Sequence, residues 1–493
     1  MSCARGIVRA AALACTFLAG AAFAEPPPRE LVIEDVTVVS PERGEPLAHA
    51  NVLVRDGRIA AVSTRPLEAS HTIDGRGRFL VPGLIDSHVH LGEAPGVTPL
   101  QAEAHPELVR AARAQEPRSY LYFGFTTVVD LISDPERTAR WRAAPDRPDV
   151  VSCGAAPIAN GYPMAWVPED LRFRLARYFL YDPRQADRIP DDIDPAEHTP
   201  EAVVRRMAAD GAVCVKTFHE TGFGGLHDLP TPTLEMARAL VAAAHERGMP
   251  VLMHANSVAA QRFALEAGAD VIAHGLWNGF EVDGDGFSNG ADGVLEAISA
   301  KGIGWQPTMQ VLQGLSDLFD ETFLDRPAVR HAYPQALIDW YRTPEGRWFH
   351  DEIASGLGGA DGRAVFASVL ERIRAVVPVV ARGDATLLFG SDTPSAPTYA
   401  NPPGLNGRLE MQRWIDAGIT EARLFRALTL DNARTFGLDE RIGSIEAGKV
   451  AHLLLLRANP LEDVSAWDTI ETVILAGRPI ARETLSATRA PRP

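Results

Sequence analysis

The middle of the chain alternates between short, continuous apolar runs and longer stretches in which apolar residues recur at helical spacing. Short apolar runs bounded by turns are typical of strands buried on both faces of a parallel sheet, and helical stretches fit the connections between such strands. The pattern predicts eight strands, at residues 83–89, 126–131, 149–154, 212–218, 250–254, 271–274, 302–307 and 386–390. Helices are predicted between them, at residues 202–210, 234–247, 258–267 and 293–301. Repeated strand–helix units of this kind predict a closed (β/α)8 TIM-like barrel over residues 81–439.

The two ends of the chain follow a different pattern. Short alternating segments separated by turns predict strands at 31–39, 50–55, 59–63 and 72–73, and again at 451–456 and 469–475. Asp56-Gly57 is a typical hairpin turn. We therefore expect one small β-sandwich domain built from both termini, residues 25–80 and 440–485.

Two connections in the barrel, 155–200 and 309–382, are too long for simple loops. Both follow strands on the side where such barrels place their active sites, so we expect them to form walls or a lid. Their aromatic residues either line a substrate site or pack the insertion against the barrel; examples are Tyr162, Trp166, Trp340 and Trp348.

The first 24 residues have the features of a signal peptide. Arg5 and Arg9 precede an apolar stretch, and Ala22-Phe23-Ala24 has the small-x-small form of a cleavage site. This predicts cleavage before Glu25 and export to the periplasm or the medium, without stable membrane insertion. A lipoprotein anchor at Cys15 is the weaker alternative.

The charge of the protein limits which kinds of partner it can bind. The net charge of −16 over 493 residues would repel nucleic acid from most of the surface, so a small-molecule substrate is favoured. The sequence leaves a homo-oligomer open. Cleavage would leave two cysteines, Cys153 and Cys214, and because both lie in apolar strand-like runs we expect buried free thiols rather than a disulfide.

Potential metal ligands stand at the ends of five predicted strands. Two histidines separated by one residue in a strand project to the same side, although such a pair alone is weak support for a metal site. Strand ends meet at one face of a barrel, so further ligands at other strand ends strengthen the prediction. The six candidates are His88, His90, Lys216, His254, His274 and Asp392.

These segments resemble the amidohydrolase superfamily over nearly the whole mature chain. Residues 81–91, 254–275 and 390–393 are similar to its strand-one, strand-five-to-six and strand-eight motifs, and 443–449 resembles the return into the terminal domain. The nearest branch contains imidazolonepropionase-like and Xaa-Pro dipeptidase-like enzymes. His452 stands where the family usually has Asp, and residues 216–225 match no particular subgroup, so the substrate is not identified.

The resemblance implies a two-metal site, with zinc as the expected metal. An ammonium group repels a cation, but the family's corresponding lysine forms a carbamate that bridges two ions. Carried over, carbamylated Lys216 would link one ion held by His88, His90 and Asp392 to a second held by His254 and His274. The alternative is an unmodified, salt-bridged Lys216 beside a single ion.

Such a site would hydrolyse a carbon–nitrogen bond in an amide, cyclic amide or dipeptide. Two ions about 3.5–4 Å apart turn a shared water into hydroxide near neutral pH and polarise a carbonyl. Asp392 would act as general base and then as general acid toward the leaving nitrogen. His219, three residues beyond Lys216, either binds substrate or is a solvated loop histidine.

Three other functions remain open at this stage. The first is a mononuclear imidazolonepropionase-like or deaminase-like hydrolase in which Lys216 is unmodified. The second is a lactone or ester hydrolase on the same site. The third is a non-catalytic scaffold, which the complete set of six ligands disfavours, because a scaffold is expected to have lost ligands.

Overall fold

The structure is a computed structural model that describes residues 29–92, 94–222, 226–284 and 286–489. The predicted signal peptide lies outside the described residues. Within the described ranges, every helix is too short or too polar to cross a bilayer.

Eight parallel strands form the central sheet, in the order β15-β14-β11-β10-β9-β8-β7-β6. Every predicted barrel strand is present, with its ends shifted by a few residues. The strands are β6 (Leu84–Val89), β7 (Phe125–Asp130), β8 (Asp149–Ala156), β9 (Cys214–Phe218), β10 (Val251–His254), β11 (Val271–Ala273), β14 (Gly304–Gln306) and β15 (Thr386–Leu387).

Hydrogen bonds join the two edges of this sheet. Ser87 N donates to Phe389 O at 3.0 Å, and Asp392 N donates to His88 O at 2.7 Å. Because these bonds connect β6 to the segment that follows β15, the sheet curls into a TIM-like barrel, and the chain ends of the first and last strands are held together.

Helices follow the strands, and polar caps define where several begin. Thr199, Thr233 and Ser257 each accept a backbone N–H of the first turn of the helix that follows. The four predicted helices are confirmed as α5 (Pro200–Ala209), α6 (Leu234–His245), α7 (Val258–Ala267) and α8 (Ala291–Lys301). The other helices outside the insertions are α1 (Pro99–Ala104), α2 (Pro106–Tyr122), α3 (Pro135–Ala143), α14 (Leu405–Asp416), α15 (Glu421–Arg426), η5 (Ala427–Asp431), α16 (Asn432–Thr435), η6 (Val464–Thr469) and η7 (Arg482–Leu485).

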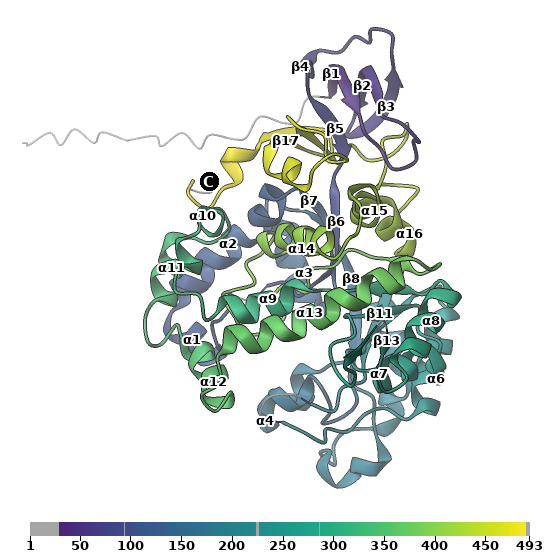
Figure 1. The fold of residues 1–493 in the computed structure, drawn as a ribbon, viewed down its shortest axis with the longest axis vertical. Helices are drawn as coiled ribbons and strands as arrows, with labels where there is room; N and C mark the ends of the chain where they lie inside the picture. Colours follow the sequence, from purple (N-terminus) through teal and green to yellow (C-terminus); the bar gives the residue numbers. More distant parts are fainter. Residues whose placement is uncertain (1–28, 93, 223–225, 285, 490–493) are drawn as a thin grey trace, which may run out of the picture.

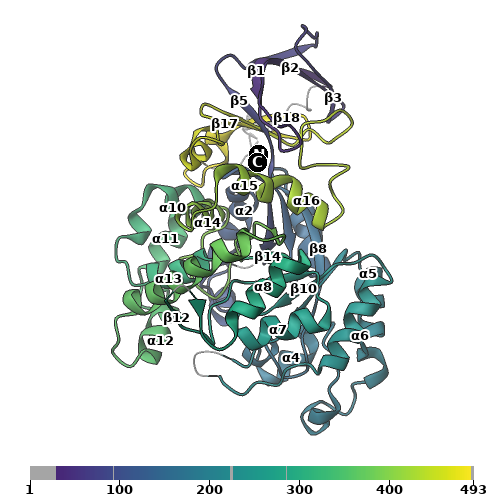
Figure 2. The ribbon, with the colours of Figure 1, turned by 45° about the vertical axis from the view of Figure 1, so that its right-hand side comes forward.

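Strands from both termini share one mixed sheet, ordered β18-β17-β16-β5-β1-β2-β3, with β4 paired to β1. Figures 1 and 2 show the N-terminal and C-terminal strands together at the top of the molecule. The expected meeting of the two ends is therefore present, while their form as a separate sandwich stays a prediction. The strands are β1 (Glu30–Val38), β2 (Leu47–Arg55), β3 (Arg58–Ser63), β4 (His71–Asp74), β5 (Phe79–Pro82), β16 (Leu453–Leu456), β17 (Ile470–Leu475) and β18 (Arg478–Ala481).

The two long connections contain short helices. The first carries η1 (Met164–Trp166), α4 (Glu169–Leu175), η2 (Pro183–Arg188) and η3 (Pro195–His198). The second carries α9 (Gln310–Asp317), η4 (Phe323–Asp325), α10 (Pro327–Ala332), α11 (Gln335–Tyr341), α12 (Trp348–Gly356) and α13 (Gly362–Ala381). In Figure 1, α10, α11 and α12 lie together at the left, and α13 runs across the centre of the molecule. A small hairpin, β12 (Val282–Asp283) and β13 (Gly286–Phe287), lies before α8.

The second insertion is anchored on the loop that follows β6. The Tyr341 hydroxyl donates to Pro95 O at 2.6 Å, and Trp348 Nε1 donates to Gly96 O at 2.8 Å. Trp340 is buried within the same insertion. Packing therefore accounts for Trp340 and Trp348, and the insertion shapes the loop beyond His90.

The prediction of free thiols is wrong. Cys153 and Cys214 form a disulfide, with their Cα atoms 4.5 Å apart. The two residues are direct partners in the parallel pairing of β8 and β9, so their side chains leave neighbouring strands at the same level. The sequence pattern placed both residues in buried strands correctly but gave no register between those strands.

Candidate metal centre

The six predicted ligands come from the carboxyl ends of five barrel strands. His88 lies in β6 and Lys216 in β9, while His254 is the last residue of β10. His274 follows β11 directly, and Asp392 follows β15 after an irregular segment, residues 388–391. Because the strands are parallel and the barrel is closed, these distant segments meet at one mouth.

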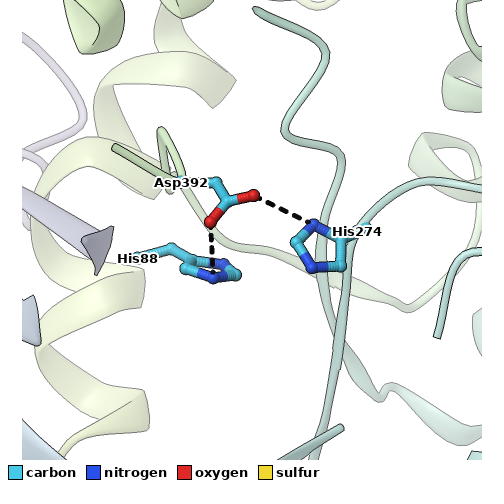
Figure 3. A group of neighbouring side chains, drawn as sticks. All are labelled: His88, His274 and Asp392. Carbon is cyan, nitrogen blue, oxygen red and sulfur yellow. Dashed lines mark ion pairs between the residues drawn. The ribbon is translucent and has the colours of Figure 1, made fainter. Parts of the chain in front are cut away.

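Asp392 is in contact with three of the histidines. Its Oδ1 atom lies 2.9 Å from His90 Nε2 and 3.2 Å from His88 Nε2, and its Oδ2 atom lies 3.7 Å from His274 Nδ1. Figure 3 shows the carboxylate between the rings of His88 and His274. One ligand atom from each of His88, His274 and Asp392 lies within 4.8 Å of the others, which is close enough for one metal ion.

Lys216 and His254 complete the cluster on its other side. Lys216 Nζ lies 3.5 Å from His88 Nε2, and its side chain is almost fully buried. The rings of His254 and His274 have centroids 4.5 Å apart. All six predicted ligands are thus neighbours in one cluster, in which His90 is half-buried and the other five are buried.

The protonation states suit a cation. Burial lowers the pKa of His88 to about 3 and holds the pKa of His274 well below its usual value. Burial raises the pKa of Asp392, but its contacts with the neighbouring histidines more than offset this and hold the pKa well below its ordinary range. Neutral imidazoles and an ionised carboxylate are the donor set that zinc prefers.

The cluster lies within a recognised family pattern. The amidohydrolase family model matches residues 79–277 and 368–480, more than half of the chain. The chain belongs to the amidohydrolase family.

Curated relatives of this amidohydrolase match over short segments. An L-hydantoinase from Paenarthrobacter aurescens is 39% identical over 64 residues, 13% of this chain and 13% of its own length. An imidazolonepropionase from Vibrio parahaemolyticus is 42% identical over 80 residues, 13% of this chain and 19% of its own length. The chain thus spans less than a fifth of the length of these two relatives.

Solved structures match over the whole fold. A Xaa-Pro dipeptidase with methionine bound in its active site aligns with a TM-score of 0.60 and 21% identity, covering 92% of this chain and 100% of the other. At this identity the likeness concerns the fold. The expected resemblance of this amidohydrolase to imidazolonepropionases and Xaa-Pro dipeptidases is confirmed.

Two polar neighbours orient the histidines of this amidohydrolase. Gln306 Nε2 donates to Ser87 O and Oγ, so Gln306 Oε1 faces His88 Nδ1 at 3.1 Å and must accept its proton. This tautomer leaves the His88 Nε2 lone pair directed toward Asp392 and Lys216. Thr308 lies after β14, and its Oγ1 is 2.9 Å from Nδ1 of His274, the residue that follows β11.

The backbone is strained at the same place. His274, Thr308 and Asp392 have φ angles of 87°, 44° and 53°, in the left-handed region that non-glycine residues rarely adopt. Such strain persists where surrounding structure fixes it, and it clusters at functional sites. Two of these three residues, His274 and Asp392, are predicted metal ligands.

His219, the predicted substrate-binding residue, lies on the loop after β9. Its ring packs against Phe263 of α7, with centroids 4.4 Å apart. Among the described residues, no hydrogen bond joins the His219 ring to the six ligands. Its role in substrate binding therefore stays a prediction.

The structure adds two residues to the site. Glu220 Oε2 lies 3.3 Å from His254 Nε2, and the Tyr162 ring lies over the His254 ring with centroids 4.7 Å apart. Residues 216, 218 and 220 alternate along an extended segment, so the strand period placed Glu220 on the side of Lys216 and could have identified it.

A cavity of about 350 Å³ opens beside His90. Tyr162 and Arg137 line it together with apolar residues of the loops after β6 and β15, among them Val97 and Pro394. The first insertion thus contributes Tyr162 to the site, as expected for a wall of the active site.

Proposed function

We propose that this enzyme hydrolyses a carbon–nitrogen bond in a small amide, cyclic amide or dipeptide with the help of two divalent ions, zinc being the expected metal. The observation that carries the proposal is the convergence of four histidines, Lys216 and Asp392 at one barrel mouth. The carboxylate of Asp392 contacts three of these histidines, His88, His90 and His274.

The residues fit two neighbouring ions. His88, His90 and Asp392 would hold the first, and His254 and His274 the second, with carbamylated Lys216 shared between them. When bound, such a pair supplies an activated water and a Lewis acid for the scissile carbonyl. The buried, neutral imidazoles of His88, His254 and His274 and the ionised carboxylate of Asp392 provide lone pairs that this arrangement needs.

Lys216 has the properties required for carbamylation. Burial lowers its pKa to about 7, so near neutral pH a substantial fraction of the side chain is the neutral amine. The amine lone pair attacks the carbon of carbon dioxide, one nitrogen-bound proton is released, and the product is an anionic carbamate. Carbamylation therefore converts Lys216, otherwise an ammonium group or a neutral amine, into an anion that could face two metal ions.

Asp392 is placed to move protons. One carboxylate oxygen contacts His88 and His90 and the other faces His274. A carboxylate held in this way would accept a proton from the attacking water and return it to the leaving nitrogen, which leaves poorly without it. Names of relatives, among them L-hydantoinase and Xaa-Pro dipeptidase, support an amide-type substrate.

A substrate screen with zinc-loaded protein tests this proposal. N-acyl amino acids, dipeptides ending in proline, lactams and lactones would be compared by kcat/KM. Turnover of at least one amide class, abolished by a chelator and restored by zinc, supports the assignment. Lactones or esters turning over much faster than every amide would overturn the carbon–nitrogen assignment while leaving the metal site intact.

A mononuclear hydrolase is the second candidate, because one group of three ligands is already compact and unmodified Lys216 fits 3.5 Å from His88. Metal analysis separates the two candidates. Two equivalents, with activity raised by bicarbonate and lost in Lys216→Ala, support the binuclear enzyme. One equivalent with an active Lys216→Ala supports the mononuclear one.

We also propose export to the periplasm or the medium. The disulfide between Cys153 and Cys214 supports this, because disulfides persist mainly in oxidising compartments. N-terminal sequencing of protein from cell fractions tests it. A mature chain beginning at Glu25 outside the cytoplasm is expected, whereas intact cytoplasmic protein would contradict export.

A further inference from the structure

Glu220 is a buried carboxylate that is not one of the six predicted metal ligands. It is 8% exposed and lies two residues after the end of β9, next to His219, whose N donates to His254 O at 2.9 Å. That bond extends the pairing of β9 with β10 past the strand ends. The position of Glu220 is therefore fixed relative to His254.

Both oxygens of the carboxylate are engaged. Gly222 N donates to Oε1 at 2.9 Å, and Oε2 lies 3.3 Å from His254 Nε2. The Asn256 side chain lies beside the same pair, with its Nδ2 atom 3.4 Å from His254 Nε2. An ionised carboxylate only accepts hydrogen bonds, so the proton of the His254 ring must be on Nε2.

This contact determines which atom of His254 can bind a metal. With Nε2 protonated, the lone pair of the neutral ring is on Nδ1, and among the described residues Nδ1 has no hydrogen-bond partner. Rotation of the ring is limited by the rings of Tyr162 and His274, whose centroids lie 4.7 and 4.5 Å away. A metal-binding histidine typically donates its other N–H to a carboxylate in this way.

We propose that Glu220 is a positioning residue for the second metal ion, fixing His254 as the tautomer that offers Nδ1 to that ion. The inference rests on the proposed metal site. Loss of Glu220 should affect the ion near His254 selectively. His88, which would hold the other ion, is oriented by a different residue, Gln306.

Zinc titration in competition with a chromophoric chelator tests the proposal. Glu220→Gln should weaken the second zinc about 10-fold and Glu220→Leu about 100-fold, the usual range for loss of such a partner. Binding of the first zinc should stay within about 3-fold of wild type, because the lost contact is to a histidine of the second ion. Glu220→Asp should recover part of the lost affinity.

Glu345 offers a matched control, because its Oε2 lies 3.2 Å from His105 Nε2, away from the cluster. Glu345→Gln should bind zinc as wild type does. Wild-type affinity for both ions in Glu220→Gln and Glu220→Asp would overturn the proposal, as would equal loss of both ions. Should Glu220→Leu fail to fold, Glu220→Gln decides. If wild type binds two zinc ions and the Glu220 variants lose affinity for the second as expected, but no amide is hydrolysed, the proposed function is refuted and this inference still holds.

Discussion

Asp392 Oδ1 lies 2.9 Å from His90 Nε2, although 302 residues separate the two in sequence. The contact exists because the segment after β15 pairs with β6: Asp392 N donates to His88 O at 2.7 Å, and His90 N donates to Thr393 O at 2.8 Å. The hydrogen bonds that close the barrel therefore also bring Asp392 to the histidines of the cluster.

Replacing Asp392 tests its proposed role in proton transfer. Asp392→Asn keeps the shape of the side chain but removes the base, so kcat for an amide substrate should fall about 10²- to 10⁴-fold. Steady-state kinetics on protein with verified zinc content measures this. Near-normal kcat at full zinc occupancy would assign the proton transfer to another group.

The metal-free protein should lose stability in acid. Burial lowers the pKa of His88 to about 3 and of His274 well below its usual value, so these side chains stay neutral in the folded state. Unfolded histidines titrate near 6.5; between pH 8 and 5.5 the unfolded state therefore binds more protons, and the free energy of unfolding falls as pH falls. The loss is about 1.4 kcal/mol for each such histidine by pH 5.5.

Denaturant unfolding of chelator-treated protein at the two pH values measures this dependence. The burial that lowers the pKa of Lys216 to about 7 acts in the same direction above that pH. His88→Asn and His274→Asn should each flatten the dependence, whereas the exposed His71→Asn should not. Stability that rises in acid would contradict the neutral, buried state of these rings.

The disulfide should contribute substantially to stability. Cys153 and Cys214 are separated by 61 residues, and a crosslink over a loop of that length constrains the unfolded chain by about 4 kcal/mol. Cys153→Ser with Cys214→Ser should lower the free energy of unfolding by about 2–4 kcal/mol. The free energy of unfolding of wild type in reductant should approach that of the double variant. If neither reductant nor the double substitution changes it, the disulfide is absent from the mature protein.

Gly390 supports the position of His88. A Cβ atom at this residue would lie 2.7 Å from His88 Cβ, which is too close for real atoms. Gly390→Ala should therefore displace His88 and weaken zinc binding, measured by titration. Gly293→Ala in α8 is the matched control, since no atom lies within 4 Å of its added Cβ. That variant should bind zinc normally and gain about 0.4–1 kcal/mol.

The sequence by itself determined the eight barrel strands and six of the side chains at their ends, because apolar runs and the two-residue strand period are local properties. The same period could have pointed to Glu220, which the sequence analysis missed, but only contact with His254 shows what that carboxylate can do. The register that joins Cys153 to Cys214 and the closure that brings Asp392 to His90 depend on which strands become neighbours. Tertiary structure alone decided those pairings, because they are set by packing between segments that are far apart in the chain.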